Sequence, residues 1–183
     1  MSVQSCKNEL SILYSNKNIQ KDERKENISK AKQIISLHNE KIIDTKTAIK
    51  ELKQICFFFA KLKDNISCGI IYHHIAKIYE KSNDFEKSKQ SYNNALKSFS
   101  NVKSIDENII TRCFFEYLFV LMNYNEYLLA DELLKKFNNI RKSWSAENQC
   151  KYGIFCGRVY EFNRFSNNIS SVISSKDFSN FLT

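Results

Sequence analysis

Apolar residues recur along most of this chain at intervals of three and four, the spacing that places them on one face of an α-helix. The pattern is weak in residues 1–27, where charged and amide side chains dominate, and it strengthens from Ile28 onward. Short polar turns separate the periodic segments, and Asp44 or Thr45, and later Ser145, are suitable helix caps. The predicted helices cover residues 28–38, 45–59, 66–81, 84–99, 109–122, 126–137, 145–161 and 166–174.

The clearest pattern is a pair of helices joined by a tight turn, in which small residues alternate with large ones. Ala76 and Ala95 are small where the two helices would cross, and Tyr92 is large enough to fill the space between them. Such helix pairs stack into scaffolds that bind other proteins. The repeat core predicted from this pattern is Ile75, Ala76, Tyr79, Phe85, Ser88, Tyr92 and Ala95, with Ala130 in a later helix.

Equivalent small residues indicate that the helix pair repeats along the chain. Ala48, Ser88 and Ala130 each follow a turn and precede an apolar helix, and their numbers differ by 40 and 42. The standard tetratricopeptide repeat (TPR) has a period of about 34 residues, so these helices or their connections are longer. We therefore predict an all-α fold, a TPR-like superhelix of antiparallel helix hairpins over residues 28–183, preceded by a poorly ordered or loosely packed segment, 1–27.

Composition agrees with long helices in a chain of one-domain size. The 183 residues include no proline and only three glycines, so the strongest helix breakers are almost absent. No run approaches the roughly 20 apolar residues of a membrane span, and the N-terminus lacks a signal-peptide core. Six cysteines without a C-x-x-C pair favour reduced structural thiols. We expect a cytoplasmic protein.

The net charge of +8 comes mainly from lysines mixed with acidic residues and many asparagines. This balance suits an acidic partner, an anionic membrane surface or nucleic acid, but a merely solvated helical surface has the same composition. The aromatic residues fall at helical core spacing and do not interleave with basic ones, which disfavours an RNA-binding platform. No nucleic-acid partner is therefore expected.

No set of residues with catalytic spacing emerges. The sequence has no glycine-rich phosphate loop, no G-x-S-x-G and no H-E-x-x-H motif. His73 and His74 are adjacent and would point about 100° apart on a helix, so they do not converge on one metal ion. The three phenylalanines at 57–59 fall mid-helix, where core packing is favoured over a membrane-inserting loop. We expect no enzymatic activity, cofactor, metal or small-molecule substrate.

Several strings occur in the order and spacing of one adaptor family. Residues 72–80 (YHHIAKIYE) look like a paired-histidine helix that ends in Ala-x-x-Tyr-Glu, and residues 84–88 (DFEKS) look like the start of the next helix. The strings at 111–115 (TRCFF) and 144–148 (WSAEN) resemble two later helices. Over residues 44–161 the chain thus resembles the SNAP family, the soluble adaptors that link the ATPase NSF to SNARE bundles.

The resemblance implies a right-handed twisted sheet of helix hairpins that binds SNARE complexes and couples them to NSF during vesicle-mediated transport, with peripheral contact to membranes. Of two basic SNARE-facing positions in the family, Arg112 keeps the charge and the other falls at Ile70. The candidate SNARE-facing residues are Arg112, Lys77, Lys81 and Lys103.

The chain also departs from the family at both ends. The family's N-terminal hairpins and membrane-touching loop have no counterpart in residues 1–27, and its NSF-stimulating C-terminal bundle has none before residue 183. These departures leave a second interpretation open, in which the chain is a TPR-like interaction subunit of another assembly with no SNARE role.

Overall fold

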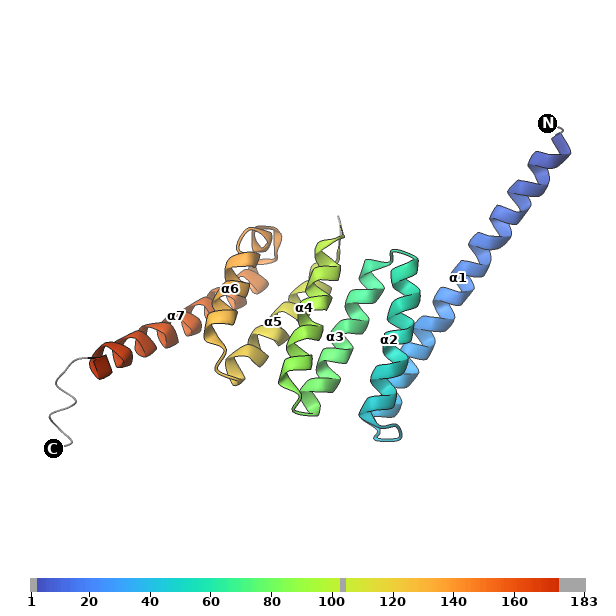
Figure 1. Ribbon diagram of the computed structural model, residues 1–183. Coiled ribbons are helices and arrows are strands. Elements are labelled where there is room, and N and C mark those ends of the chain that lie inside the picture. Colours follow the sequence, from blue (N-terminus) through green and yellow to red (C-terminus); the bar gives the residue numbers. More distant parts are fainter. Residues whose placement is uncertain (1–2, 103–104, 175–183) are drawn as a thin grey trace. The chain divides into compact units, whose positions relative to one another are not determined.

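The computed structural model describes the backbone of residues 3–102 and 105–174, and the side chains of residues 21–102 and 105–165. Within these residues the regular secondary structure is entirely helical (Figure 1), which confirms the all-α prediction. The elements are α1 (Val3–Asn39), α2 (Thr45–Lys61), α3 (Asn65–Lys81), α4 (Phe85–Ser100), α5 (Glu107–Asn123), α6 (Tyr127–Phe137), a 3₁₀ turn η1 (Ile140–Ser143) and α7 (Ala146–Ser174). The chain divides into two compact units, Met1–Ile105 and Asp106–Thr183.

The same turn closes the hairpins α2–α3, α3–α4 and α5–α6. In each, the residue after the C-cap has a positive φ, namely 55° at Lys63, 56° at Asn83 and 60° at Asn125. The next amide then donates back across the last helical turn, as the Asp64 amide does to the Phe59 carbonyl at 2.9 Å. This is the Schellman arrangement, in which two backbone bonds satisfy carbonyls that the helix end leaves open.

The residue that completes each turn also begins the next helix. The carboxylates of Asp64 and Asp84 accept hydrogen bonds from the amides of Ser67 (3.1 Å) and Lys87 (3.3 Å), so each aspartate is an N-cap. Glu126 occupies the corresponding position before α6 but makes no side-chain cap bond. Because one residue both closes the C-terminal motif and precedes the next helix, each turn is short and the helices that it joins are antiparallel neighbours.

Helices α3 and α4 cross closely because small residues line the contact. Ala76 and Ala95 are fully buried, and the Ser88 hydroxyl donates to the Ala76 carbonyl at 3.1 Å. A Cβ atom added to Gly69 would lie 2.3 Å from a ring carbon of Phe99, which is itself buried. The alternation of small and large residues in the sequence therefore corresponds to a real helix crossing.

The predicted repeat core is mostly interior. Ile75, Ser88, Tyr92 and Ala130 are fully buried, in addition to Ala76 and Ala95. The Tyr92 hydroxyl donates to Glu80 at 3.1 Å, which satisfies its polar end. Tyr79 and Phe85 are half-buried, because both lie near the α3–α4 turn, where Lys87 and Lys89 cover their rings at 5.6 and 5.0 Å.

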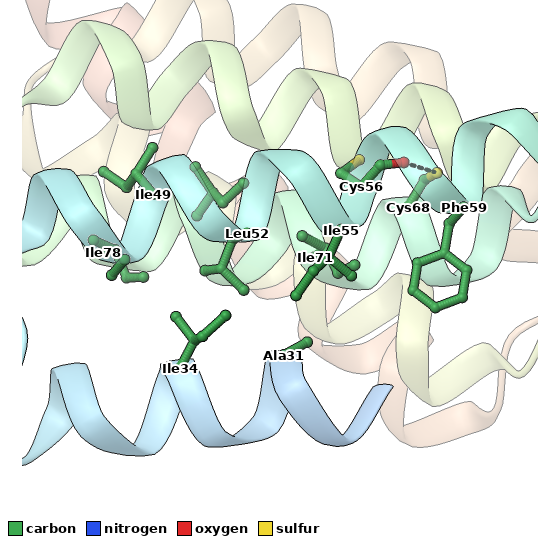
Figure 2. Packing of buried hydrophobic residues seen from close by; sticks show 12 residues of the cluster. Ala31, Ile34, Ile49, Leu52, Ile55, Cys56, Phe59, Cys68, Ile71 and Ile78 are labelled. Carbon is green, nitrogen blue, oxygen red and sulfur yellow. Dashed lines mark hydrogen bonds between the residues drawn. The ribbon is translucent and has the colours of Figure 1, made fainter. Parts of the chain in front are cut away.

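Helix α1 supplies the remaining wall of the first unit's core. Figure 2 shows Ala31 and Ile34 of α1 directed toward apolar side chains of α2 and α3 such as Leu52, Ile71 and Ile78, and all five are buried. Two ion pairs add to this contact, Arg24 with Asp64 and Lys30 with Glu51, the second at 3.8 Å.

The second unit is built around aromatic rings. Phe114 of α5 is fully buried, with ring centroids 4.4 Å from Phe137, 5.4 Å from Trp144 and 6.0 Å from Tyr152. The Tyr152 hydroxyl donates to the Leu134 carbonyl at 2.5 Å, so a buried polar group has its partner. These rings hold α5, α6, η1 and α7 together.

The predicted boundaries of the four central helices lie within two residues of α3, α4, α5 and α6. Two other helices continue past a predicted boundary, α1 through residue 27 and α7 through residues 161–166. Neither boundary has a proline or glycine, so nothing in the chain interrupts the helix there. Whether a distinct domain begins at residue 28 stays a prediction. Among the described residues, no helix combines the length and apolar character that crossing a membrane requires.

The glycine contact generates a test of the α3–α4 crossing. We expect Gly69→Ala to lower the free energy of unfolding by about 1–2 kcal/mol, because overpacking against a buried ring exceeds the gain in helix propensity. The measurement is urea unfolding followed by circular dichroism at the helix band. A protein whose stability is unchanged or higher would contradict the close crossing.

The matched control is Gly153→Ala in α7. No atom lies within 4 Å of a Cβ placed there, so only the helix-propensity effect applies. We expect this variant to be about 0.5–1 kcal/mol more stable than the parent protein.

Candidate protein-binding surfaces

Helix α3 has two further strips of residues on either side of its main helix contacts. Its Ile71, Ile75 and Ile78 belong to the core shared with α2, whereas Gly69 and Ala76 face α4. Residues of an α-helix are spaced about 100° apart, so these two contacts leave one strip on each side. The first strip consists of Ile70, His74, Lys77 and Lys81, named here the α3 basic strip, and the second of Cys68, Tyr72 and Tyr79. In the second strip Cys68 is buried, and Tyr72 and Tyr79 are half-buried against the core.

The α3 basic strip brings together two of the four candidate SNARE-facing residues. Lys77 is half-buried and Lys81 is exposed, one turn further along the helix. The Lys81 ammonium group donates to Asn39 in the last turn of α1 at 2.7 Å. Lys103 lies outside the described residues, and Arg112 belongs to the other unit.

An apolar cleft adjoins the α3 basic strip. It has a volume of about 230 Å³ and lies between α1 and α3, with Ile28, Ile35 and Ile70 among its walls. His74 and Lys32 also line it, so basic side chains stand at an apolar opening. Ile70 occupies a position where the family that the chain resembles has a basic residue. In this structure it is an apolar wall of the cleft. The cleft depends on the packing of α1, and no local sequence signal reveals it.

Arg112 stands on the outward face of α5. Its side chain is 68% exposed, and its Nε donates to Glu116 at 3.1 Å. Phe119 lies two turns beyond Arg112 on the same face and is 53% exposed, although most large apolar residues of α5 are buried. Arg112, Glu116 and Phe119 form the α5 strip, which joins a cation to an exposed aromatic ring.

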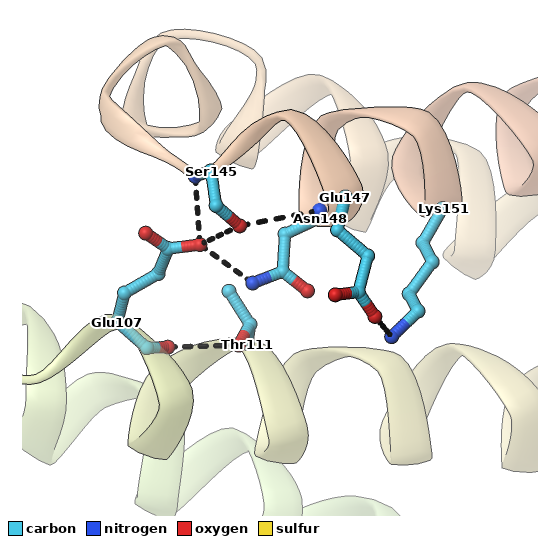
Figure 3. A network of polar contacts seen from close by, with 6 residues as sticks. All are labelled: Glu107, Thr111, Ser145, Glu147, Asn148 and Lys151. Carbon is cyan, nitrogen blue, oxygen red and sulfur yellow. Dashed lines mark hydrogen bonds and ion pairs between the residues drawn. The ribbon is translucent and has the colours of Figure 1, made fainter.

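The beginning of α5 is tied to the beginning of α7 by one carboxylate. Glu107 accepts hydrogen bonds from the backbone amide and hydroxyl of Ser145, each at 2.8 Å, and from the side-chain amide of Asn148 at 2.5 Å (Figure 3). The Ser145 hydroxyl in turn accepts from the Asn148 backbone amide at 3.4 Å, close to the limit of a hydrogen bond. These bonds fix the direction in which α5, and hence the α5 strip, leaves the aromatic core.

The same bonds shift the titration of Glu107. Hydrogen bonds from the Asn148 side chain and from the amide and hydroxyl of Ser145 hold its pKa below the usual value of a glutamate. Each bond favours the charged form of the carboxyl group.

The histidine and cysteine side chains that could take part in chemistry lie mostly in the packed interior. His73 is buried, with its ring 5.7 Å from that of Tyr92. Cys56, Cys68 and Cys113 are buried free thiols, and burial raises the pKa of Cys68 to about 12. A thiol with so high a pKa is protonated and a poor nucleophile. In the part of the chain that the structure describes, no group of three or more His, Cys, Asp or Glu side chains is arranged to hold a metal ion.

The three phenylalanines at 57–59 do not act together. Phe59 is buried and Phe58 is partly buried against the same core, but Phe57 is 63% exposed. Core packing was expected for all three, and it is wrong for Phe57. Three consecutive helical residues span about 200° of the helix surface, so one face cannot bury them all.

Comparison with models of protein families, with curated proteins and with solved structures found no match to this chain. The surfaces described above therefore stand on their own residues and geometry.

The Glu107 network generates a prediction about pH. The folded-state pKa of Glu107 is lowered, so its stabilising contribution is present above the unfolded pKa and is lost as pH falls through the folded pKa. We expect Glu107→Gln to destabilise the second unit at pH 7 and to flatten the loss of stability that the parent shows from about pH 5 downward. Urea unfolding can be followed by the fluorescence of Trp144, the single tryptophan, which lies next to the network.

Glu147→Gln is the control for the change of charge. Glu147 lies in the first turn of α7, and its carboxylate accepts from Lys151 at 2.6 Å, within its own helix. We expect Glu147→Gln to change the stability measured by Trp144 fluorescence less than Glu107→Gln does. Equal effects of the two variants at every pH would show that the Glu107 bonds contribute nothing beyond charge.

Proposed function

We propose that this chain is a SNAP-like adaptor, a TPR-like superhelix of antiparallel hairpins that binds SNARE complexes and links them to an NSF-type ATPase for disassembly. The ordered strings within residues 44–161 motivate the proposal. Each falls at a structural feature of matching kind: 72–80 within α3, 84–88 at the start of α4, 111–115 within α5 and 144–148 at the start of α7. In this proposal the protein works in the cytoplasm, with peripheral contact to vesicle or endomembrane surfaces.

The observation that carries the proposal is that Arg112 and Phe119 are both exposed on one face of α5, two turns apart. SNARE bundles present acidic stripes, which an exposed cation can meet. Arginine is among the residues that dominate binding energy when an interface desolvates them, and an apolar ring on the same helix face gives the partner apolar surface to cover. Arg112 and Glu116 form an exposed ion pair one turn apart, which contributes about 0.3–0.5 kcal/mol. Breaking it so that the guanidinium group can bind a partner therefore costs little.

The α3 basic strip adds a second contact of the same kind. Lys77 and Lys81 supply positive charge beside an apolar cleft, which suits a helix that carries acidic residues and one exposed apolar side chain. Contacts between exposed charges are individually weak and are screened by salt over about 10 Å at 0.1 M. Binding through these strips would therefore be spread over several residues and sensitive to salt.

A second candidate function rests on Ile70. This residue lines the α1–α3 cleft instead of supplying a charge, and Ile28 at the same cleft is 41% exposed. An apolar opening on the partner-facing side favours a partner with a complementary apolar residue. The alternative is therefore a TPR-like interaction subunit of a different multiprotein assembly.

The test of the SNARE proposal is retention of the purified chain on an immobilised assembled SNARE bundle, followed by recruitment of NSF. We expect retention at about 50 mM salt and loss at several-fold higher salt, because the contacts are electrostatic. Arg112→Ala should weaken retention by about tenfold, the size expected for an arginine at the centre of an interface.

Arg158→Ala is the matched control, because Arg158 is an exposed arginine of α7 in the same unit. We expect it to bind like the parent protein. No retention at low salt, or equal losses for both arginine variants, would overturn the proposed role. Stable co-purification with an assembly that lacks SNARE proteins would favour the second candidate.

A further inference from the structure

A groove runs along α3 between α2 and α4, on the side away from the α3 basic strip. Its volume is about 650 Å³, within the usual range for ligand sites. Tyr72 and Tyr79 line its floor, and both lie about 140–160° around the helix from Lys77. We name it the α2–α4 groove. It lies wholly within the first unit and uses neither the α5 strip nor the α3 basic strip.

The charged side chains that line the groove are all positive. Its lining includes Lys53 from α2 and Lys87 from α4, with no aspartate or glutamate. Lys87 is already held by Asp84, the N-cap of α4, at 2.5 Å. Lys53 is exposed and, among the described residues, has no carboxylate within ion-pair distance. Lys53 is therefore the cation in the groove that is available to an acidic ligand.

Apolar surface lies one turn further along α2. Phe57 and Ala60 line the groove there, and the Phe57 ring is 63% exposed, with the Lys61 ammonium group 4.5 Å from its centroid. An exposed aromatic ring beside a cation can cover an apolar side chain of a ligand, which removes apolar area of both from water.

The opposite wall offers groups that can bind a peptide backbone. Gln90 and Asn94 lie one turn apart on the groove side of α4. Their side-chain amides each both donate and accept hydrogen bonds, as an extended peptide backbone requires. The hydroxyls of Ser91 and Ser98, in contrast, already donate to carbonyls of α4 itself, at 2.7 and 2.9 Å.

We infer that the α2–α4 groove binds an extended acidic peptide segment of a partner protein. A carboxylate of the segment meets Lys53, its backbone meets Gln90 and Asn94, and an apolar side chain covers Phe57. The wall from Lys87 to Ser98 is about 16 Å long, enough for about five extended residues. This site does not depend on the SNARE proposal, because it lies on the other side of α3.

The test uses two blocked, fluorescein-labelled hexapeptides, one alternating glutamate with leucine and the other alternating glutamine with leucine. Fluorescence anisotropy measures their binding to the full chain. We expect the glutamate peptide to bind at least about fivefold more tightly, because only it can pair with Lys53. Lys53→Ala should abolish this preference, and Phe57→Ala should weaken both peptides by a similar factor.

Lys25→Ala is the control for the loss of one positive charge. Lys25 is exposed on α1 and is no part of the groove lining, and its nearest carboxylate is that of Asp22 at 3.9 Å. We expect this variant to keep the preference for the glutamate peptide. Circular dichroism checks that the variants, all at exposed positions, remain folded.

Three results would overturn the inference. They are no measurable binding of either peptide up to about 1 mM protein, equal affinity for the two peptides, and an equal loss of preference in Lys53→Ala and Lys25→Ala. Tighter binding of an oligouridine that displaces the peptide, and that also depends on Lys53, would assign the groove to nucleic acid instead.

Discussion

The close crossing of α3 and α4 is the constraint on which the first unit depends. Gly69, Ala76 and Ala95 keep the helices near enough for the Ser88 hydroxyl to reach a carbonyl of the facing helix. With that contact made, the rotation of α3 about its own axis is settled. Ile71, Ile75 and Ile78 then belong to the core shared with α2, one strip forms the floor of the α2–α4 groove, and the opposite strip carries Lys77. The surfaces of this unit thus follow from where small residues occur along one helix.

The turns impose the second constraint, and they do so without glycine. Lys63, Asn83 and Asn125 adopt positive φ, a conformation that asparagine tolerates well and lysine less well. Backbone bonds across each turn offset this cost, and at two of the turns an aspartate cap on the next helix contributes as well. Because this turn, with its positive-φ residue and backbone bonds, occurs in both units, antiparallel hairpins form in a chain that has only three glycines.

Sequence periodicity predicted the four central helices to within two residues and most of the buried repeat core, because burial on one helix face is a local property. Periodicity did not predict the exposure of individual neighbouring residues, or surfaces that are formed by segments far apart in the sequence. Phe57 is exposed because three consecutive side chains cannot share one face. Ile70 is a cleft wall only because α1 packs beside α3, and the groove residues Lys53 and Asn94 are 41 positions apart. Periodicity also carries no information on the angle between successive hairpins, so it specifies hairpins without specifying their superhelix.

The first unit places two chemically different surfaces on opposite sides of one helix. The α3 basic strip adjoins a small apolar cleft between α1 and α3, whereas the α2–α4 groove is larger, polar along one wall and aromatic at one end. A ligand in the groove would not occlude the basic strip, since α3 lies between them, and contacts that share no residues contribute nearly additively to binding. Two ligands that bind opposite sides of one fixed helix are held close to each other, which raises the effective concentration of each ligand around the other. In the proposed adaptor, this property would come from the rotation of α3 that the crossing with α4 imposes.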